Sequence, residues 1–545
     1  MDSKKVVIIG GVAAGASAAA RMRRLDERAQ ITIFERGGHV SYANCGLPYH
    51  IGGVIEKRQS LLVTTPEKFK SWYNIDVRTL SAVTSIDRAN KLVHVSCQGG
   101  EYDYPYDYLV IATGSSAYTP KVEGDDNPRV GHLWTIADMD RIAKFLQSGA
   151  KEAVIVGAGF IALEAAENLR RIGVGVTLVQ RSNRVLPIID DEMSIPVRTQ
   201  LSALGVKLKL GCEVVRYEAV SDGVGVVLSN GEVLHSDIVL TGTGVRPNSE
   251  LALNAGLKCS AEGYIVVDEH MRTSDPYIYA AGDVVEVAEP IFGGRTHIPL
   301  AGPANKQGRI AADNIAGFDR KYRGTFGASI VKIGSVNVGS VGFTERRLKI
   351  ADKPYKKLYL HPSSSAAYYP ATTRMDLKLL FGDDGTIYGA QIVGESGVDK
   401  RIDTIASAMQ SSLKADELAD LELSYAPPFN SAKDPVNFAG FVASNILGGI
   451  TDHVYADEVP SDAFLLDVRE PGEVAAGGVS GAVNIPLGSL RSRLSELPKD
   501  RLIVAMCKVG MRGYLAERIL KQNGFKAANL SGGYLTVQAF KSLSK

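Results

Sequence analysis

The segment Val6-Val7-Ile8-Ile9-Gly10-Gly11-Val12-Ala13-Ala14-Gly15 decides the fold of the N-terminal part of this chain. Its apolar run predicts a buried parallel strand, its glycines predict a tight turn, and Ala16 to Leu25 should form a helix. A second strand is expected at Ile31–Phe34. It ends at Glu35, close to the roughly 20-residue spacing of a ribose-binding acid. The pattern predicts a dinucleotide-binding βαβ unit, although Val12 stands where G-x-G-x-x-G has its middle glycine.

The same arrangement recurs later in the chain. An apolar strand is expected at Ala153–Val156, followed by the glycine loop of Gly157 and Gly159, which matches G-x-G-x-x-A. A helix is then expected at Leu163–Ile172 and a strand at Val176–Val179. Two such units predict two bound dinucleotides, each with its pyrophosphate at a helix N-terminus. The alternative is a chance pair of glycine loops in unrelated α/β domains.

Two further segments sharpen the first site. Tyr108–Gly114 reads as a strand ending in a turn, Thr273–Asp283 reads as a strand ending in an acid, and Gly244–Asn248 marks the end of the inserted second unit. In this order the motifs resemble the pyridine nucleotide–disulfide oxidoreductase family over about residues 1–450. That resemblance implies FAD at the first glycine loop and NADH or NADPH at the second. The implied cofactor contacts are Gly10, Gly15, Glu35, Asn44, Thr113, Gly114, Gly282 and Asp283 for FAD, and Gly157, Gly159, Phe160, Gln180 and Arg181 for the nicotinamide nucleotide.

Composition limits the possible functions. The 545 residues predict several domains, and a net charge of +1 argues against a protein that binds nucleic acid or another polyanion. Five cysteines, an odd number, argue against a disulfide framework. No apolar run reaches the roughly 18 residues of a membrane span, and the N-terminus lacks the pattern of a signal peptide. We therefore expect a cytoplasmic protein with reduced thiols and no membrane association.

The C-terminal part divides into two further domains. After residue 326 short β-prone runs and a helical stretch near Ile402–Gln410 resemble the family's α+β dimerisation domain, which implies a homodimer. A new α/β domain then begins near Phe464 and resembles a single rhodanese domain. The expected fold is α/β with two Rossmann-like domains and these two additions. The expected domain limits are 1–114 with 245–326 for FAD, 115–244 for NAD(P)H, 327–450 for dimerisation, 451–458 for a linker and 459–545 for rhodanese.

Cys45 is the candidate redox residue. It lies in Tyr42-Ala43-Asn44-Cys45-Gly46-Leu47-Pro48-Tyr49, and no second cysteine lies nearby to form an internal redox disulfide. The open alternatives are a mixed disulfide with a small thiol, a sulfenic acid and a persulfide. The segment resembles the single-cysteine branch, which comprises coenzyme A-disulfide reductases and NADH oxidases. That resemblance implies a cysteine at a helix N-terminus, which favours thiolate, whereas the alternative is a buried structural cysteine.

Two other segments resemble the coenzyme A subgroup. These are Ser424–Pro435, which contains Tyr425, and His361–Pro370, which contains Tyr368 and Tyr369. The resemblance implies that tyrosines from these segments reach the partner's cysteine across the dimer. A phenol there can hydrogen-bond a sulfur anion or protonate a leaving thiolate. Whether Tyr368 or Tyr369 accompanies Tyr425 stays open, and ordinary interface packing is the alternative for all three.

Cys507 opens the loop Cys507-Lys508-Val509-Gly510-Met511-Arg512 after an apolar strand. A loop of this length can curl backbone N–H groups around a sulfur anion, and Arg512 adds positive charge. The loop therefore predicts a thiol that carries sulfane sulfur, although some rhodanese-like modules are inactive. Three other cysteines lack a motif and are expected to be structural, namely Cys97, Cys212 and Cys259.

The choice of nicotinamide nucleotide depends on the end of the strand after the second glycine loop. Gln180 stands where an NADH-selective site often has a carboxylate, and Arg181 and Arg184 could bind a 2′-phosphate. The alternative is that both arginines are solvated, and we expect use of both nucleotides. The family resemblance implies that Phe160 is an aromatic residue that moves to admit the nicotinamide.

Taken together, the motifs predict an FAD-dependent, NAD(P)H-driven reductase of coenzyme A disulfide, coenzyme A persulfide or polysulfide, with coenzyme A as substrate or bound mixed disulfide. Cys45 would accept the electrons and Cys507 would carry sulfane sulfur. One alternative is an NADH oxidase whose Cys45 cycles through sulfenic acid. Another is a redox-sensing or sulfur-delivery module with negligible turnover of small disulfides.

Overall fold

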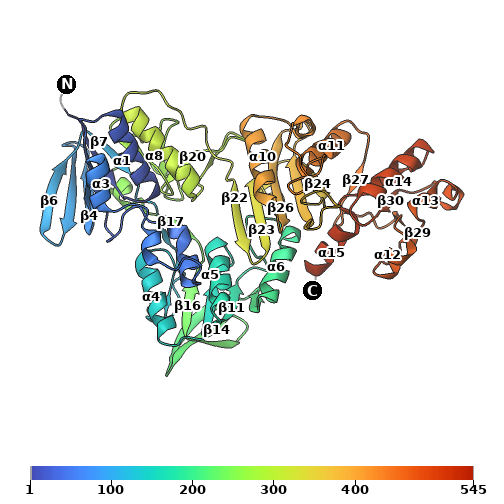
Figure 1. The fold of residues 1–545 in the computed structure, drawn as a ribbon, viewed down its shortest axis with the longest axis horizontal. Coiled ribbons are helices and arrows are strands. Elements are labelled where there is room, and N and C mark those ends of the chain that lie inside the picture. Colours follow the sequence, from blue (N-terminus) through green and yellow to red (C-terminus); the bar gives the residue numbers. More distant parts are fainter. Residues whose placement is uncertain (1–2, 544–545) are drawn as a thin grey trace. The chain divides into compact units, whose positions relative to one another are not determined.

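The structure is a computed structural model that describes residues 3–543. The chain forms two compact units (Figure 1). One comprises Met1–Asn183 with Leu204–Gly327, and the other comprises Arg184–Ala203 with Ala328–Lys545. The first unit contains both glycine loops, and the second contains the dimerisation and rhodanese-like regions. Every type of domain expected from the sequence is therefore present as α/β or α+β structure.

The first unit is built on a parallel sheet whose central strand precedes the first glycine loop. Apolar, β-branched residues fill this strand, and four of its five residues are buried because helices cover both faces of such a sheet. Two helices, α1 (Ala13–Leu25) and α8 (Ala301–Ile315), pack against each other beside it. In sheet order the strands are β19 (Ile278–Ala280), β7 (Tyr108–Ile111), β1 (Lys5–Ile9), β2 (Gln30–Phe34) and β3 (Asp76–Arg78).

A second parallel sheet in the same unit carries the second glycine loop. Its main helices are α4 (Ile136–Gln147) and α5 (Phe160–Arg171). The chain crosses to it and back through an antiparallel pair, β8 (Ser115–Ala117) and β17 (Val245–Pro247). In sheet order the strands are β12 (Val206–Leu210), β11 (Gly175–Gln180), β10 (Glu152–Val156), β16 (Ile238–Thr241) and β9 (Val130–Gly131).

Two antiparallel sheets extend the first unit. Both are three-stranded meanders, as expected for consecutive short β-prone segments joined by tight turns. The first meander consists of β4 (Ser81–Asp87), β5 (Leu92–Cys97) and β6 (Gly100–Pro105), and the second of β13 (Val214–Val220), β14 (Gly223–Leu228) and β15 (Val233–Ser236).

The second unit begins with a five-stranded antiparallel sheet, which confirms the expected α+β region. Helices α10 (Val398–Gln410) and α11 (Pro435–Leu447) belong to this region. Helix α6 (Ile195–Ala203), from the earlier part of the chain, contacts its first two strands. In sheet order the strands are β22 (Ser329–Ile333), β23 (Val336–Gly342), β26 (Ile387–Gly394), β25 (Met375–Phe381) and β24 (Lys356–Leu360).

A buried ion cluster holds the segment Arg184–Ala203 to this sheet. Lys378 is fully buried, and its Nζ lies 2.8 Å from Asp190, 2.6 Å from Glu192 and 2.7 Å from Glu345. The three carboxylates have the spacing of a metal site, but the ammonium group already lies among them. A buried charge is stable only when it is paired, so the cluster explains why this segment belongs to the second unit.

The C-terminal domain is a parallel five-stranded sheet with helices α12 (Pro471–Ala475), α14 (Met511–Gln522) and α15 (Gly533–Leu543). We expected a linker at 451–458. The structure instead places an edge strand at His453–Val454, and its backbone pairs with the strand at Ala527–Leu530. Two residues are too few to show an apolar pattern. In sheet order the strands are β27 (His453–Val454), β31 (Ala527–Leu530), β30 (Ile503–Met506), β28 (Phe464–Asp467) and β29 (Val483–Asn484).

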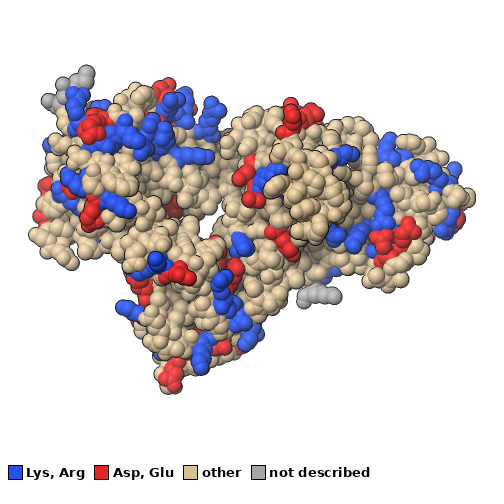
Figure 2. All heavy atoms as spheres, viewed as in Figure 1, with Lys and Arg blue, Asp and Glu red and all other residues tan. Residues whose placement is uncertain are grey.

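Among residues 3–543, no helix is both long enough and apolar enough to cross a membrane. Lys and Arg side chains are interspersed with Asp and Glu side chains over the face seen in Figure 2. This mixture agrees with the net charge of +1.

Candidate functional site

The first glycine loop has the close backbone approach that a bound dinucleotide requires. Gly10 has a φ of +96°, and a Cβ there would lie 2.3 Å from the carbonyl oxygen of Ala112. A Cβ on Gly15 would lie 1.9 Å from the carbonyl oxygen of Gly10. No side chain caps the N-terminus of α1, so its free N–H groups can receive a phosphate.

Glu35 lies directly beside this loop. Its Oε2 accepts a hydrogen bond from the backbone N–H of Gly11 (2.9 Å), and its Oε1 accepts one from Gly37 (2.8 Å). These two bonds fix the carboxylate at the carboxyl end of β2. An acid fixed there can bind the hydroxyls of a ribose, as the sequence predicts.

The remaining expected flavin contacts meet at the same sheet edge, because parallel strands end together. Asp283 follows β19, and its Oδ2 accepts a hydrogen bond from Ser115 (2.9 Å). Burial raises the pKa of Asp283, and the hydrogen bond from Ser115 partly opposes this.

Thr113 and Gly114, two further expected flavin contacts, follow β7, and the Thr113 hydroxyl donates a hydrogen bond to the carbonyl of Asn248. Gly282 precedes Asp283, and its N–H donates to Gln307 (2.8 Å).

The second glycine loop repeats the first. Gly157 has a φ of +109°, and a Cβ there would lie 2.2 Å from the carbonyl oxygen of Gly242. Gly159 caps α5 without a side-chain hydrogen bond, and a Cβ at this position would point into open space. Phe160 is the first residue of the helix. The residues therefore fit a second dinucleotide whose pyrophosphate occupies the space in front of Gly159.

The residues expected to choose between NADH and NADPH belong to two different compact units. Gln180 ends β11 and donates a hydrogen bond to Ser182 (3.0 Å). Arg181 is 81% exposed, with its guanidinium 3.9 Å from Glu213. Arg184 belongs to the second unit and forms an ion pair with Asp191 (3.0 Å). Of the two arginines, Arg181 is therefore the one that shares a unit with the glycine loop.

Cys45 lies in a single 3-10 turn, Asn44–Gly46, which leads into the short helix α2 (Leu47–Ile51). The residue is exposed, and its backbone N–H donates to the side-chain oxygen of Asn44 (3.1 Å). Asn44, expected to contact the flavin, thus also shapes the turn that carries the thiol.

The surroundings of Cys45 in the protein alone act against the thiolate that the family resemblance implies. The pKa of its thiol is raised because surrounding protein atoms desolvate it, and because the carboxylates of Glu164 and then Asp283 repel its charge. A backbone hydrogen bond opposes these effects only partly. A five-residue helix is too short for its N-terminus to outweigh them.

Glu164 was not identified from the sequence. It lies one turn after Phe160 on α5, and its Oε1 accepts a hydrogen bond from the Tyr49 hydroxyl (3.0 Å). Burial raises the pKa of Glu164 to about 7, despite the hydrogen bond from Tyr49. The sequence signal for Glu164 is that its carboxylate directly follows the apolar run Phe160-Ile161-Ala162-Leu163. Its pairing with Tyr49 depends on contact between α2 and α5, which are distant in sequence.

The tyrosines are paired within the second unit. The hydroxyls of Tyr368 and Tyr425 lie 2.8 Å apart, so Tyr368, rather than Tyr369, is hydrogen bonded to Tyr425. Both rings are exposed, at 74% and 48%. The hydrogen bond between the two hydroxyls raises the pKa of Tyr425. The pair offers a phenol donor on a protein surface.

A buried arginine fixes the two segments that carry these tyrosines. Arg401 is 1% exposed and donates to the carbonyl of Ser364 (3.0 Å) and to the side chain of Asn430 (2.8 Å). It also forms an ion pair with Asp434 (3.2 Å), which caps α11. The loops are therefore held by a guanidinium that uses its several donors in a fixed geometry.

The loop of Cys507 has the expected shape. Cys507 is 1% exposed, and its Sγ accepts a hydrogen bond from the backbone N–H of Gly510 (3.2 Å). Gly510 has a φ of +98° and caps α14. The carbonyl of Cys507 accepts from Tyr534 (2.8 Å), and a Cβ on Gly533 would lie 2.3 Å from that carbonyl. One backbone N–H of the loop therefore contacts the thiol, as expected for a residue that holds a sulfur anion.

Arg512 lies in the first turn of α14, but it is not a free cation. Its two terminal nitrogens lie 2.7 and 2.8 Å from the two carboxylate oxygens of Glu473. The pKa of Arg512 is raised chiefly by this hydrogen bonding to Glu473, with a smaller contribution from Cys507. Arg512 therefore faces both a carboxylate and the thiol.

The three cysteines without a motif, Cys97, Cys212 and Cys259, are all free and partly exposed.

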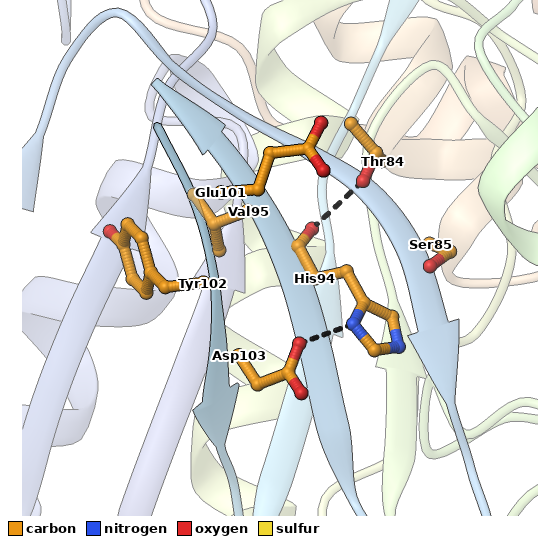
Figure 3. Close-up of a pocket in the computed structure, with 7 residues that line it drawn as sticks. All are labelled: Thr84, Ser85, His94, Val95, Glu101, Tyr102 and Asp103. Atoms are coloured by element: carbon orange, nitrogen blue, oxygen red, sulfur yellow. Dashed lines mark hydrogen bonds and ion pairs between the residues drawn. The ribbon is translucent and has the colours of Figure 1, made fainter. Parts of the chain in front are cut away.

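A hollow on the first meander, β4–β6, lies outside the candidate site (Figure 3). The hydroxyl of Thr84 donates to the carbonyl of His94 (3.3 Å), and the His94 ring is hydrogen bonded to Asp103. None of the residues predicted from the motifs lines this hollow. The lining residues are Thr84, Ser85, His94, Val95, Glu101, Tyr102 and Asp103.

Comparison with protein families accounts for most of the chain. Residues 4–308 match the pyridine nucleotide-disulphide oxidoreductase family, and residues 328–435 match the dimerisation domain of the same family. Residues 453–539 match the rhodanese-like domain. That last match begins at the edge strand β27, in agreement with the topology of the C-terminal sheet.

Curated relatives match about four-fifths of the chain. The NADH oxidase of Methanocaldococcus jannaschii is 35% identical over 438 residues, which cover 80% of this chain and 97% of the relative. The coenzyme A disulfide reductase of Staphylococcus haemolyticus is 34% identical over 448 residues, which cover 81% of this chain and 100% of the relative.

Two solved structures match almost the whole chain. Reduced CoADR-RHD of Bacillus anthracis has a TM-score of 0.97 at 42% identity, and the alignment covers 99% of this chain and 98% of that one. The NAD-dependent persulfide reductase from A. fulgidus has a TM-score of 0.92 at 39% identity, with coverage of 98% and 99%.

Proposed function

Because this chain belongs to the pyridine nucleotide-disulphide oxidoreductase family, we propose that it is an NAD(P)H-dependent, FAD-containing reductase of coenzyme A disulfide, coenzyme A persulfide or polysulfide. One observation carries the proposal. The flavin-side thiol, Cys45, has no second cysteine in its loop, and the same chain carries the backbone-wrapped thiol Cys507. A single redox thiol needs a small thiol partner, and a sulfur carrier on the same chain suggests a sulfane-sulfur substrate.

The chemistry at Cys45 follows from its exposed thiol. When bound, FAD passes the electrons of the nicotinamide hydride to sulfur. The Cys45 thiolate attacks a disulfide R–S–S–R, forms Cys45–S–S–R and releases one thiolate. Two electrons and a proton then cleave this mixed disulfide into the Cys45 thiolate and a second thiol. With a persulfide R–S–SH as the substrate, cleavage of its S–S bond by two electrons and a proton yields the thiol and hydrosulfide.

Other residues have supporting roles in this proposal. Glu35 and Asp283 hold the flavin nucleotide, and Phe160 covers the nicotinamide position. Tyr425 and Tyr368 donate a proton to the leaving thiolate of a homodimer partner's site. The exposed position of both rings supports their contact with a second copy of the chain.

Further parts of the proposal concern organisation. We propose FAD-binding segments at 1–114 and 245–326, an NAD(P)H-binding segment at 115–244 and a dimerisation domain at 327–450. The rhodanese domain includes β27 and so begins near residue 453. The five free cysteines suit a reducing compartment, and we propose the cytoplasm.

Oxygen reduction is the second candidate, favoured by the NADH oxidase relative. Anaerobic NADH consumption by the holoenzyme distinguishes the two functions. The proposal predicts turnover with coenzyme A disulfide or coenzyme A persulfide without oxygen, and loss of this turnover in Cys45→Ser. Cys97→Ser serves as the matched control, because Cys97 lies at the end of β5 in the first meander and belongs to neither thiol site. Rapid NADH consumption with oxygen, and none with either sulfur substrate, would contradict the proposal.

A further inference from the structure

Arg512, which interacts with Cys507, is paired with a carboxylate whose position is fixed on two sides. Glu473 binds both terminal nitrogens of Arg512, and its Oε2 also accepts from the backbone N–H of Glu470 (3.1 Å). The second contact is half of a capping box at the start of α12. The two side chains of the ion pair are about one-third exposed, at 33% for Glu473 and 31% for Arg512. Bidentate contacts of this kind hold a geometry well.

The same carboxylate is ionised at any working pH. Hydrogen bonding from Arg512 holds the pKa of Glu473 at about 2. The charge of Arg512 is therefore balanced by a permanent negative charge. A second arginine near the loop, Arg469, is likewise paired with Asp467 (2.6 Å) and stacked on the Tyr534 ring. Lys508, which is exposed in the loop itself, is left as the cation facing solvent.

This balance of charge matters because sulfur donors differ in charge at the reacting atoms. Thiosulfate brings a dianion next to the thiol and releases sulfite. An alkyl persulfide brings one negative charge at most and releases a thiolate. Glu473 neutralises the arginine that interacts with the thiol, so the site attracts anions less than an unpaired arginine would, and a dianion loses more of this attraction than a monoanion.

We propose that Glu473 is a specificity-determining residue, which makes Cys507 a selective acceptor of sulfur from alkyl persulfides and a poor acceptor from thiosulfate. The inference rests on the proposed sulfur-carrying role of Cys507 and names its substrate class. In the favoured reaction the Cys507 thiolate attacks the outer sulfur of R–S–SH. The S–S bond of the donor breaks, R–S⁻ leaves with the electron pair, and Cys507–S–SH forms. With thiosulfate the same attack forms the Cys507 persulfide and releases sulfite.

The test is the rate at which Cys507 is loaded with sulfur in the full-length holoenzyme. Glutathione persulfide and thiosulfate are used as separate donors, and the extra sulfur atom on the Cys507 peptide is followed by mass spectrometry after rapid quenching. Glu473→Gln removes the charge but keeps the capping box, because glutamine also serves at this helix position. The proposal predicts that this change raises loading by thiosulfate about tenfold and loading by glutathione persulfide less than about twofold.

A matched variant and a salt series separate this effect from general changes in charge. Glu470→Gln removes one charge three residues away, whereas both terminal nitrogens of Arg512 bind Glu473. It should leave both rates within about twofold. The gain with thiosulfate in Glu473→Gln should shrink as the ionic strength rises, because salt screens a partly exposed charge.

Three outcomes would overturn the inference, and each has a different meaning. An equal change in both donors, or an unchanged rate with thiosulfate, would contradict the specificity role while leaving Cys507 as the sulfur carrier. Loss of loading with both donors in Glu473→Gln would assign Glu473 a structural role instead. Full sulfur transfer by Cys507→Ser would contradict the proposed function itself.

Discussion

The two thiols that the function requires lie in opposite surroundings. Cys45 is exposed and lies in a single 3-10 turn. Desolvation by surrounding atoms, and then the carboxylates of Glu164 and Asp283, raise the pKa of its thiol. Cys507 is 1% exposed and receives a backbone N–H at 3.2 Å. The contrast suits two roles. An open thiol can form a mixed disulfide with a large partner, and a wrapped thiol can shelter one transferred sulfur atom.

The scaffolds around the two thiols differ as well. The Cys45 turn is positioned by packing of α2 against α5, where a Cβ on Gly52 would lie 2.2 Å from the Asn168 side chain. The Cys507 loop is positioned by the turn before α15, whose Ser531 hydroxyl accepts from the N–H of Tyr359 (3.1 Å). Each thiol can therefore be altered, or its support weakened, without direct change to the other.

The largest expected effect is the loss of one activity in each cysteine variant, reduction in Cys45→Ser and sulfur transfer in Cys507→Ser. Cys45→Ser should reduce disulfide and persulfide reduction by at least about a thousandfold, because the electrons have no other sulfur to reach. Cys507→Ser should remove sulfur transfer to a similar extent and leave reduction of coenzyme A disulfide nearly intact. Steady-state assays of both reactions on both variants measure this. Bound FAD in Cys45→Ser serves as the folding control, and a Cys507→Ser variant that lost both activities would contradict separate roles.

The second effect concerns the support of the Cys507 half. Lys378→Met leaves the buried carboxylates of Asp190 and Glu192 without their cation, and should cost about 3–5 kcal/mol of stability in the second unit. Hydrogen exchange in β24 and β25 should accelerate, while exchange in β1 and β7 should stay unchanged. Lys356→Met is the matched control. It breaks an ion pair with an Asp383 side chain that is 80% exposed, so it should cost less than about 1 kcal/mol. Equal destabilisation by both variants would contradict the role of the cluster.

A smaller effect tests the charge environment of Cys45. Glu164 has a pKa of about 7, so it is mostly charged above neutral pH and mostly neutral below it. Its charge raises the pKa of Cys45, so Glu164→Gln should accelerate alkylation of Cys45 about threefold above pH 7. The acceleration should vanish as the pH falls through 7, where the wild-type carboxyl is already neutral. Peptide mass spectrometry after iodoacetamide treatment measures it. The same ratio at every pH would mean that the effect of Glu164 is structural.

The smallest effect concerns nucleotide choice. Arg181→Ala should raise the KM for NADPH about twofold to fivefold and leave that for NADH unchanged, because only NADPH has a 2′-phosphate. The effect is small because the side chain is 81% exposed and screened by solvent. Arg184→Ala is the control, since its guanidinium is already paired with Asp191. Equal changes in KM for both nucleotides after Arg181→Ala would exclude recognition of the 2′-phosphate.

The sequence predicts those parts of the molecule that depend on local patterns. Apolar runs followed by glycines correctly locate β1 and β10, because a buried parallel strand and a close turn leave few residue choices. The Cys507 loop is likewise predictable, since its shape depends on contiguous residues. The two-residue strand at His453–Val454 is missed because its order comes from pairing with a distant strand.

Long-range contacts explain what the sequence did not reveal at the site. The raised pKa of Cys45 depends on Glu164, which is far away in the chain and reaches the thiol only when α2 packs against α5. The pairing of Arg512 with Glu473 likewise joins two separate helices. A motif shows which residue types are present, but the charge that surrounds them depends on the tertiary fold.

Peptide-level mass spectrometry of the wild-type holoenzyme tests the division between the two thiols most directly. The protein would be exposed briefly to coenzyme A persulfide without oxygen, sampled, and then given NADH. The account predicts one extra sulfur atom on the Cys507 peptide and a coenzyme A or persulfide adduct on the Cys45 peptide. NADH should remove the Cys45 adduct, with release of coenzyme A from the former or hydrosulfide from the latter. An unmodified Cys507, or an NADH-driven reaction that leaves the Cys45 adduct in place, would contradict it.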